Sequence, residues 1–405
     1  MIMDIQLVQE AESGDLLIDF GNQPITNKFI KSSDELVPEF PLVLRVSSNS
    51  GLIKINDPFP VEEVKPIYDW LTCFEPEEHL DEVVEKIIQL PGVSVNSVFG
   101  AYSFKDDTTI ERLRARGYTK TWRIDPELDL GVTDNCANVE TFQSVFDDSK
   151  AKQIRDGKGA ADVLIVRHVI EHAYKITDFV NAIRKLTKPG GYVVWELPDC
   201  EQSLENGDCT MIWEEHAYYF TSNTFRQLLF NHGFEIVHFD SYPYPIENSI
   251  VAIVKNTSVD TILPSLDQSI LNVEIARARK YLNVLNARRN SVREKLSELH
   301  NENGPIAIFG AGHQTATFIS IMGISDLICC VIDDNKHKQD MLMPIEDLQI
   351  IGSEVLYSKN IKICLLGLNP QNHQKVMDKH QLFIQNGGKF ISIFPGTEMD
   401  IELIK

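Results

Sequence analysis

Apolar residues recur along this chain with the two spacings that distinguish helices from strands. From about residue 79, short apolar runs typical of buried strands alternate with segments in which apolar positions return every three or four residues. The pattern predicts helices over His79–Leu90, Thr108–Arg116 and Ile176–Leu186. It predicts strands over Val93–Phe99, Lys120–Ile124, Asp162–Val166, Tyr192–Leu197 and Ile250–Val254. This alternation predicts an α/β fold with a mainly parallel sheet covered on both faces.

The pattern divides the chain into four parts. Residues 1–78 form a small, irregular N-terminal domain with β-like pieces at 41–46 and 51–55, and residues 79–262 form the main α/β domain. A long charged stretch with few breakers predicts a connecting helix within 263–303, and Gly304 suits its C-terminal end. Residues 304–405 begin with an apolar strand and form a second, Rossmann-like α/β unit.

Composition narrows the class of protein. The 405 residues carry a net charge of −21, which disfavours nucleic acid and anionic membranes as partners. No apolar run approaches the roughly 20 residues needed to cross a bilayer, and the acidic N-terminus is unlike a signal peptide. The seven cysteines are scattered, as in proteins that keep their thiols reduced. We therefore expect a soluble cytoplasmic protein, and the sequence leaves its oligomeric state open.

The main domain carries an ordered series of local features. Asp125 ends the second strand, where an acidic side chain can bind both ribose hydroxyls of a nucleotide. Residues 161–172 are a strand followed by a His-rich loop, and Lys188–Gly191 turn an amphipathic helix into the next strand. The series resembles class I S-adenosylmethionine-dependent methyltransferases, which implies S-adenosylmethionine as cofactor and Gly100, Asp125 and His168 as residues that contact it.

The loop after the first strand departs from that resemblance. Class I enzymes place several glycines there so that the backbone can approach the cofactor, but only Gly100 fits. Lys105, Asp106 and Asp107 stand where small residues are expected. The loop is either an altered cofactor site, which we favour because Asp125 is retained, or a loop that no longer binds.

A second chemical signal lies at residues 211–221, where Glu214, Glu215 and His216 are flanked by aromatic side chains. A histidine with a pKa near neutrality can act as a general base, and a neighbouring carboxylate can orient it. The alternative is a surface loop with a solvated run of charges beside core aromatics.

Three segments resemble elements of the nucleotide-sugar C-methyltransferases that act on 4-keto-deoxysugars. They are residues 19–29, with a Gly-x-x-Pro-Ile-x-Asn-x-Phe pattern, residues 213–220, with Glu-His-x-x-Tyr-Phe, and residues 332–339, with Ile-Asp-Asp-Asn-x-x-Lys-Gln. The resemblance implies that His216 removes the proton next to the sugar ketone, that Glu215 orients or polarises the reacting pair, and that His172 lies near the reacting centre. O-methylation, N-methylation and a non-methylating role are the alternatives.

The chain departs from this family at its zinc ligands and at two tyrosines. The family carries Cys-x-x-Cys pairs for a structural zinc, whereas this chain has Ser47–Ser50 at one of them and no cysteine before Cys73, so we expect no metal. Tyr68, Trp70 and Trp213 occupy the family's aromatic substrate positions, with tryptophan in place of tyrosine at Trp70 and Trp213. Asn248, in a Pro-rich stretch, either contacts the sugar or belongs to a rigid turn.

The last unit contains a nucleotide-binding pattern. Pro305–Thr315 is a strand leading into Gly-x-Gly and a helix, and an acidic residue follows about 20 positions later. The ligand is either NAD, which would make the chain an oxidoreductase, or the nucleotide of a sugar, which the resemblance favours. The pattern is also compatible with a Rossmann-like domain that has only a structural role and binds no ligand. A further alternative is that the protein is a catalytically altered relative of the family, which binds nucleotide-sugars without methylating them. The residues predicted to contact the nucleotide-sugar here are Gly310, Gly312, His313, Asp333, Asp334 and Lys338.

Overall fold

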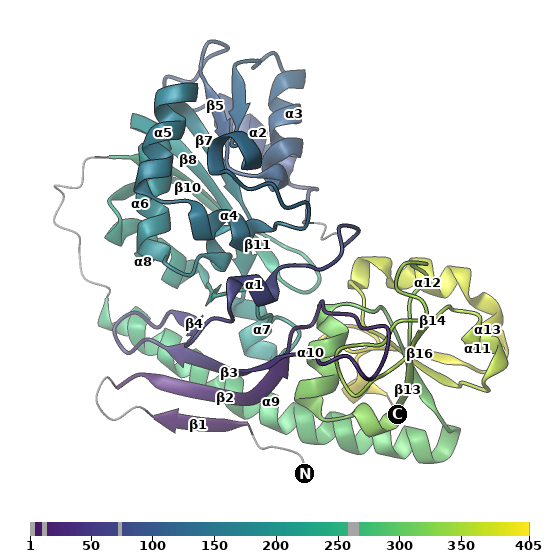
Figure 1. The fold of residues 1–405 in the computed structure, drawn as a ribbon. Coiled ribbons are helices and arrows are strands. Elements are labelled where there is room, and N and C mark those ends of the chain that lie inside the picture. Colours follow the sequence, from purple (N-terminus) through teal and green to yellow (C-terminus); the bar gives the residue numbers. More distant parts are fainter. Residues whose placement is uncertain (1–4, 10–13, 72–74, 258–266, 405) are drawn as a thin grey trace.

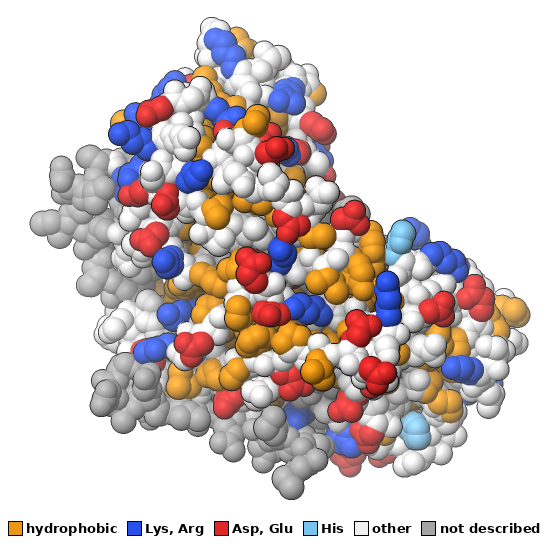
Figure 2. Space-filling view, viewed as in Figure 1, with side chains coloured by type: hydrophobic (Ala, Val, Ile, Leu, Met, Phe, Trp, Pro, Cys, Tyr) orange, Lys and Arg blue, Asp and Glu red, His pale blue; other side chains and the backbone are white. Residues whose placement is uncertain are grey.

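The computed structural model describes residues 5–9, 14–71, 75–257 and 267–404; Cys73 lies outside them. Two Rossmann-like units and a small antiparallel sheet are arranged around one long helix (Figure 1). On the face drawn in Figure 2, lysine and arginine are interspersed with aspartate and glutamate rather than gathered into one basic patch. Within the described residues, no helix is both long enough and apolar enough to cross a membrane.

The main domain is a six-stranded sheet in the order β10-β11-β8-β7-β5-β6. Its strands are β5 (Phe99–Ala101), β6 (Thr121–Arg123), β7 (Ala161–Arg167), β8 (Thr187–Asp199), β10 (Phe234–Tyr242) and β11 (Asn248–Asn256). Strands β6, β5, β7 and β8 are parallel, whereas β11 is antiparallel to β8 and β10 to β11. This order confirms the class I methyltransferase Rossmann-like fold that the sequence predicts.

Helices cover both faces of that sheet, as its apolar strands require. They are α2 (Leu80–Ile88), α3 (Asp107–Ala115), α4 (Val139–Val145), α5 (Asp148–Lys158), α6 (Ile176–Leu186) and α8 (Ser222–Asn231), with α7 (Glu201–Asn206) after β8. Helix α6 buries Phe179, Ile183 and Leu186 on one face, at the spacing that predicted it. The predicted strand over 93–99 is shorter than expected, because Ser94 and Ser97 hydrogen-bond across a turn before β5.

The N-terminal segment corrects one expectation, because it is a regular sheet rather than an irregular domain. Strands β1 (Gln6–Gln9), β2 (Leu16–Pro24), β3 (Glu39–Val46) and β4 (Ile53–Ile55) pair antiparallel, and α1 (Val61–Val64) follows them. The fifth strand, β9 (Tyr218–Tyr219), comes from the main domain and pairs with β4. The alternation of apolar and polar residues within a segment does not reveal that it pairs with a strand more than 150 residues away. The sequence therefore shows only short β-like pieces.

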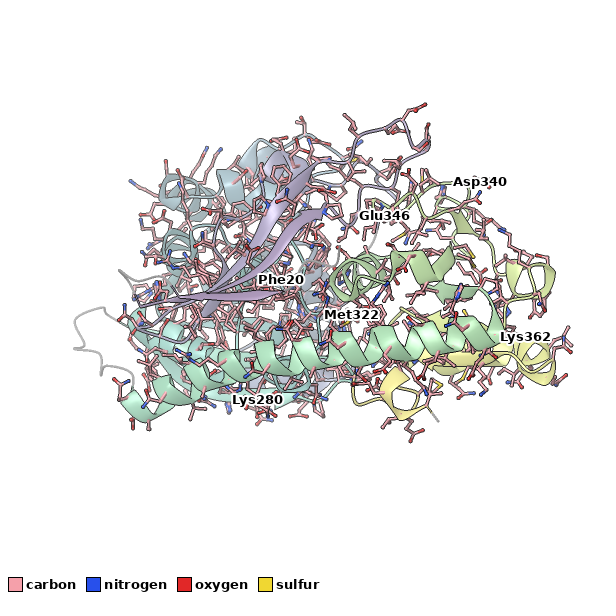
Figure 3. The ribbon with its side chains drawn as sticks, turned by 90° about the horizontal axis from the view of Figure 1, so that it is seen from below. Phe20, Lys280, Met322, Asp340, Glu346 and Lys362 are labelled. Atoms are coloured by element: carbon pink, nitrogen blue, oxygen red, sulfur yellow. The ribbon has the colours of Figure 1, made fainter. Side chains whose placement is uncertain are left out.

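Helix α9 (Gln268–Asn303) begins after an Asp267 cap and ends at Gly304. It runs beneath both the N-terminal sheet and the C-terminal unit (Figure 3). Tyr281, Leu285 and Val292 are buried on its inner face and belong to one apolar core that includes residues of both units. The helix is therefore a shared packing surface as well as the connector that the sequence predicts.

The C-terminal unit is an all-parallel sheet in the order β14-β13-β12-β15-β16. Its strands are β12 (Ile306–Phe309), β13 (Ile328–Ile332), β14 (Ile350–Ile351), β15 (Ile363–Leu366) and β16 (Lys389–Ser392). Its helices are α10 (His313–Met322), α11 (Val355–Ser358), α12 (His373–Lys379) and α13 (Gln381–Gln385). The strand order reverses between β12 and β15, and in doubly wound sheets ligands bind at the carboxyl ends of the strands at such a switch point.

Candidate functional site

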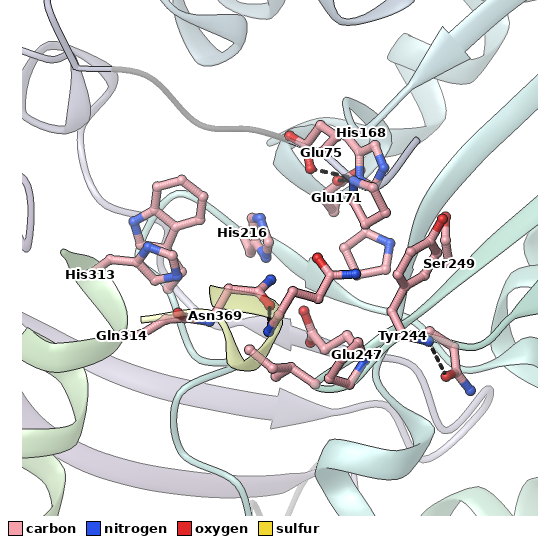
Figure 4. Close-up of a pocket in the computed structure, with 17 residues that line it drawn as sticks. Glu75, His168, Glu171, His216, Tyr244, Glu247, Ser249, His313, Gln314 and Asn369 are labelled. Carbon is pink, nitrogen blue, oxygen red and sulfur yellow. Dashed lines mark hydrogen bonds and ion pairs between the residues drawn. The ribbon is translucent and has the colours of Figure 1, made fainter. Parts of the chain in front are cut away.

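The carboxyl ends of the two Rossmann-like sheets open onto one cavity of about 330 Å³ (Figure 4). In the main domain, His168 and Glu171 follow β7, while Glu247 and Asn248 come from the β10–β11 turn, which lies beside the carboxyl end of β8. The C-terminal unit contributes residues from both sides of its switch point: His313 and Gln314 after β12, and Asn369 and Gln371 after β15. We call this space the shared cavity. It lies where both folds are expected to bind ligands.

His216 lies in the middle of the shared cavity, between His313 on one side and Glu171 and Glu247 on the other (Figure 4). Its ring centroid is 4.8 Å from that of His172 and 5.0 Å from that of Trp213. Burial, and then the neighbouring His172 and Lys105, lower the pKa of His216 well below its ordinary value. The ring is therefore neutral at pH 7, which is the form that can accept a proton.

Glu214 and Glu215 face the N-terminal domain rather than His216. The backbone and hydroxyl of Thr26 donate to Glu214 Oε1 at 2.6 and 2.9 Å, and Asn27 donates to Glu215 Oε1 at 2.9 Å. Burial raises the pKa of Glu214 to about 7. Burial together with Glu140 and Glu214 raises the pKa of Glu215 well above its usual range. The N-terminal Pro-Ile-Thr-Asn motif thus positions the two carboxyls.

A second cavity, of about 190 Å³, lies on the other side of the Trp213–His313 pair. These two rings stack at 4.3 Å with 14° between their planes, and both line the two cavities. The second cavity brings together several residues that the sequence singled out: His172, Trp213, Glu215, Gly312, His313 and Lys338. Glu140 also lines it, and its Oε1 is hydrogen-bonded to His172 Nδ1.

A third cavity, of about 140 Å³, lies at the carboxyl ends of β5 and β6 in the main domain. Its walls include the apolar side chains of Phe104, Ile124 and Leu130. Asp125 lies between two residues that line it, and its Oδ1 accepts from the backbones of Glu127 and Leu128, capping the next helical turn. An apolar slot beside a carboxylate at the end of the second strand fits the adenosine of S-adenosylmethionine.

Replacing Asp125 by asparagine is expected to weaken S-adenosylmethionine binding about tenfold, because a neutral amide holds ribose hydroxyls less strongly than a carboxylate. Asparagine can still cap the helical turn, so the fold is preserved. Isothermal titration of both proteins with the cofactor measures the effect. The exposed neighbour offers a control, since Glu127→Gln should bind as the unmodified chain does. Equal affinity in the Asp125 variant would show that this carboxylate does not contact the cofactor.

The glycine predicted to contact the cofactor has a packing role instead. Gly100 lies within β5, and a Cβ there would come within 2.6 Å of Trp122 and 2.9 Å of Leu164. It lines none of the three cavities described above. In the following loop, Asp106 Oδ2 accepts from the backbones of Tyr102 and Ser103 at 2.8 Å. The unexpected aspartate thus orders the loop by using amides that a glycine-rich loop would leave for the ligand.

His168, also predicted at the cofactor, is held as a cation in the wall of the shared cavity. Burial opposes its charge, but Glu75, Glu171 and Glu196 outweigh burial and raise the pKa of His168 to about 10. Its Nε2 lies 3.1 Å from Glu196 Oε1 and its Nδ1 3.4 Å from Glu75 Oε2. It is therefore a fixed positive charge and not a proton acceptor.

Some residues predicted to bind substrate lie outside these cavities. Tyr68 stacks on Trp70 at 4.9 Å, and Trp70 stacks on His337 at 5.4 Å. Asp333 accepts from the backbones of Ala311 and Asn335, at 3.0 and 2.8 Å, and so orders its own loop. The other two are also engaged locally: Asp334 in an ion pair with Lys379, and Gly310, at φ +107°, in close packing against Gly367 and Leu368.

Sequence reasoning missed several acidic and amide side chains that line the cavities or are hydrogen-bonded to residues that line them. Glu171 stands in the same His-rich loop as His168 and His172, so its position was a usable signal. Glu140, Glu196 and Asn369 are single polar residues in ordinary helical, strand or loop contexts and carry no local signal.

The zinc position of the family is occupied by a turn of another kind. The β3–β4 turn presents hydroxyls, and Asp15 Oδ1 accepts from the backbone of Ser48 at 2.7 Å. Serine hydroxyls are not the ligands of a structural zinc, so that turn does not fit one.

Comparisons with known proteins relate the chain to methyltransferases. Residues 106–239 match the model of a methyltransferase domain, and residues 255–395 match the model of a C-methyltransferase C-terminal domain. The C-methyltransferase NovU of Streptomyces niveus is 21% identical over 393 residues, covering 94% of this chain and 92% of its own.

Solved methyltransferase structures resemble part of the chain. The 1,6-didemethyltoxoflavin-N1-methyltransferase of Burkholderia thailandensis, with S-adenosylhomocysteine bound, has 11% identity and a TM-score of 0.30, covering 45% of this chain and 78% of its own. An S-adenosylmethionine-dependent methyltransferase of Archaeoglobus fulgidus has 12% identity and a TM-score of 0.29, covering 44% of this chain and 94% of its own.

Proposed function

Because the chain is an S-adenosylmethionine-dependent methyltransferase related to C-methyltransferases, we propose that it methylates a carbon next to the ketone of a nucleotide-linked keto-sugar, with His216 as the base. The observation that carries the proposal is the position of His216: a neutral imidazole in the cavity onto which both Rossmann-like sheets open. The C–H bond beside a ketone is acidic enough for a positioned imidazole to remove its proton.

The shared cavity supplies groups that suit the rest of this reaction. When bound, S-adenosylmethionine supplies an electrophilic methyl group. Removal of the proton leaves negative charge on the ketone oxygen, and donors aimed at that oxygen are the largest demand on the site. Burial, and then Asp208, raise the pKa of Glu247 to about 8, so this carboxyl is mostly protonated at pH 7 and can donate a hydrogen bond.

The sugar hydroxyls and the diphosphate of the proposed substrate each have suitable binding groups nearby. Amide side chains of Asn248, Asn369 and Gln371 line the shared cavity and suit sugar hydroxyls. Helix α10 begins at His313 directly after the Gly-x-Gly turn, and the backbone amides at a helix N-terminus favour phosphate. Lys338 lines the neighbouring cavity with Gly312 and His313. We therefore propose that the sugar occupies the shared cavity and that its diphosphate lies at the start of α10.

The test is an assay of the full chain with S-adenosylmethionine and a panel of nucleotide-linked 4-keto-deoxysugars. We expect one panel member to gain a single methyl group by mass spectrometry, and NMR to place the methyl on the carbon next to the ketone. Methylation on oxygen or nitrogen would contradict the proposed chemistry. Nucleotide-sugar binding without methyl transfer would instead support the non-catalytic alternative. In that case the loop that Asp106 orders would no longer bind the cofactor for methyl transfer.

A further inference from the structure

Three side chains with metal-binding groups converge on the wall of the second cavity. Glu140 comes from α4, His172 from the helical turn after β7, and Glu215 from the loop before β9. One ligand atom of each lies within 4.8 Å of the ligand atoms of the other two. The three residues are far apart in the sequence, so their convergence is a product of the fold.

One carboxylate oxygen of this cluster has no hydrogen-bond donor. Glu140 is 1% exposed, and its Oε2 has no hydrogen-bond partner in the described part of the chain. Its other oxygen is hydrogen-bonded to His172 Nδ1. Glu215 is also buried, and its Oε1 accepts from Asn27. A buried carboxylate oxygen without a donor is costly unless a cation coordinates it.

Other ionisable side chains surround the cluster. Glu214 adds a third buried carboxyl group directly beside Glu215. Two lysines line the second cavity, but Lys105 is paired with Glu75 at 2.6 Å and Lys338 with Asp333 at 3.4 Å. The carboxyl groups of the cluster therefore have no lysine ion pair of their own among the contacts of the described residues.

The ring of His172 has the surroundings of a metal-binding histidine. Its Nδ1 faces Glu140, while its Nε2 lies 3.9 Å from Glu171 Oε1. A histidine that binds a metal through one ring nitrogen usually directs its other N–H to a carboxylate, which fixes the ring orientation. Glu171 offers a carboxylate on the side of the ring away from Glu140, although 3.9 Å is longer than a hydrogen bond and the ring would have to move closer to form one.

We propose that Glu140, His172 and Glu215 bind one divalent first-row transition-metal ion at the wall of the second cavity. Two carboxylates and one imidazole suit Mn²⁺, Fe²⁺ or Zn²⁺ better than Ca²⁺ or Mg²⁺. The ion replaces the proton shared by Glu140 and His172 and leaves coordination positions open toward the cavity. Its link to the reaction rests on the proposed function: His172, one of its ligands, packs against the proposed base His216, with ring centroids 4.8 Å apart.

The test is a Mn²⁺ titration of the chelator-stripped full chain, followed by the electron paramagnetic resonance signal of free Mn²⁺, with Zn²⁺ as competitor. We expect one ion per chain, and at least tenfold weaker binding in Glu140→Gln and in Glu215→Gln. Glu247→Gln, which removes an acidic group from the shared cavity instead, is the matched control and should bind as the unmodified chain does. Thermal unfolding of each variant shows whether it is folded.

Other results would overturn the site. No stoichiometric binding of Mn²⁺ or Zn²⁺ up to millimolar concentration excludes it. Binding that survives both glutamine substitutions excludes it as well. Binding lost in His216→Asn but kept in Glu215→Gln would move the ion to the other side of His172, where Glu171 and His216 also converge. Because the readout is binding without substrate, its failure is distinct from a failure of the proposed methyl transfer.

Discussion

Replacement of His216 by asparagine is expected to slow proton removal from the substrate by about 10²- to 10⁴-fold, the range that general-base catalysis contributes. Asparagine keeps a polar side chain of similar reach but has no basic nitrogen. The ring of His216 packs against His172 and Trp213 through ring contacts alone, so the fold should tolerate the change. Cofactor affinity should stay the same, because the adenosine slot is a separate cavity.

The measurement is exchange of solvent deuterium into the carbon next to the ketone, with an unreactive cofactor analogue bound. This separates proton removal from methyl transfer. His300→Asn, on α9 and away from all three cavities, is the control and should exchange at the unmodified rate. Undiminished exchange in the His216 variant would assign the base to another group.

Replacement of Glu196 by alanine is expected to lower the free energy of unfolding by about 3–5 kcal/mol, the usual cost of removing one partner from a buried ion pair. Glu196 is 1% exposed and accepts from Arg167 Nε at 2.5 Å and from Ser249 at 3.2 Å. His168 and His79 each place a ring nitrogen within 3.2 Å of the same carboxylate. Without Glu196, the buried charge of Arg167 has lost its principal counter-ion.

Urea unfolding followed by circular dichroism measures this loss. The surface pair Arg116–Glu85, at 2.7 Å, gives the comparison, because Glu85 is half exposed and Glu85→Ala should cost no more than about 1 kcal/mol. A similar small cost at Glu196 would mean that water or rearrangement compensates Arg167. Since Arg167 also donates to the carbonyls of Lys105 and Pro76, the Glu196 variant should also loosen the loop at the cofactor end.

The structure brings together several of the site residues that the sequence selects. Composition and resemblance select His216, His172 and Glu215, and the structure places His216 beside His172, with His172 and Glu215 both in the wall of the second cavity. Asp125 lies next to the adenosine slot for the local reason expected, since it ends the second strand. Their roles stay predictions until the variants are measured.

For other residues, a ligand contact was predicted only from their position in a motif. In the structure, these residues contact neighbouring parts of the chain. Gly100 makes room for Trp122, Asp333 orders its own turn, and Tyr68 and Trp70 stack with His337. In each case a neighbouring group takes the space or the hydrogen bond that the motif would have left for a ligand. A motif specifies the backbone path, but most neighbours of a side chain come from elsewhere in the chain.

From the sequence alone, helices α2, α3, α6 and α9, most strands of the main domain and the two Rossmann-like units could be predicted, because periodicities of 2 and 3.6 residues are local properties of the chain. Only the tertiary structure decided that β9 completes the N-terminal sheet, that Trp213 stacks on His313, and that Glu140 meets His172. These contacts join segments tens to hundreds of residues apart. They depend on strand register and on how packed elements meet, and no local pattern of apolar and polar residues encodes either.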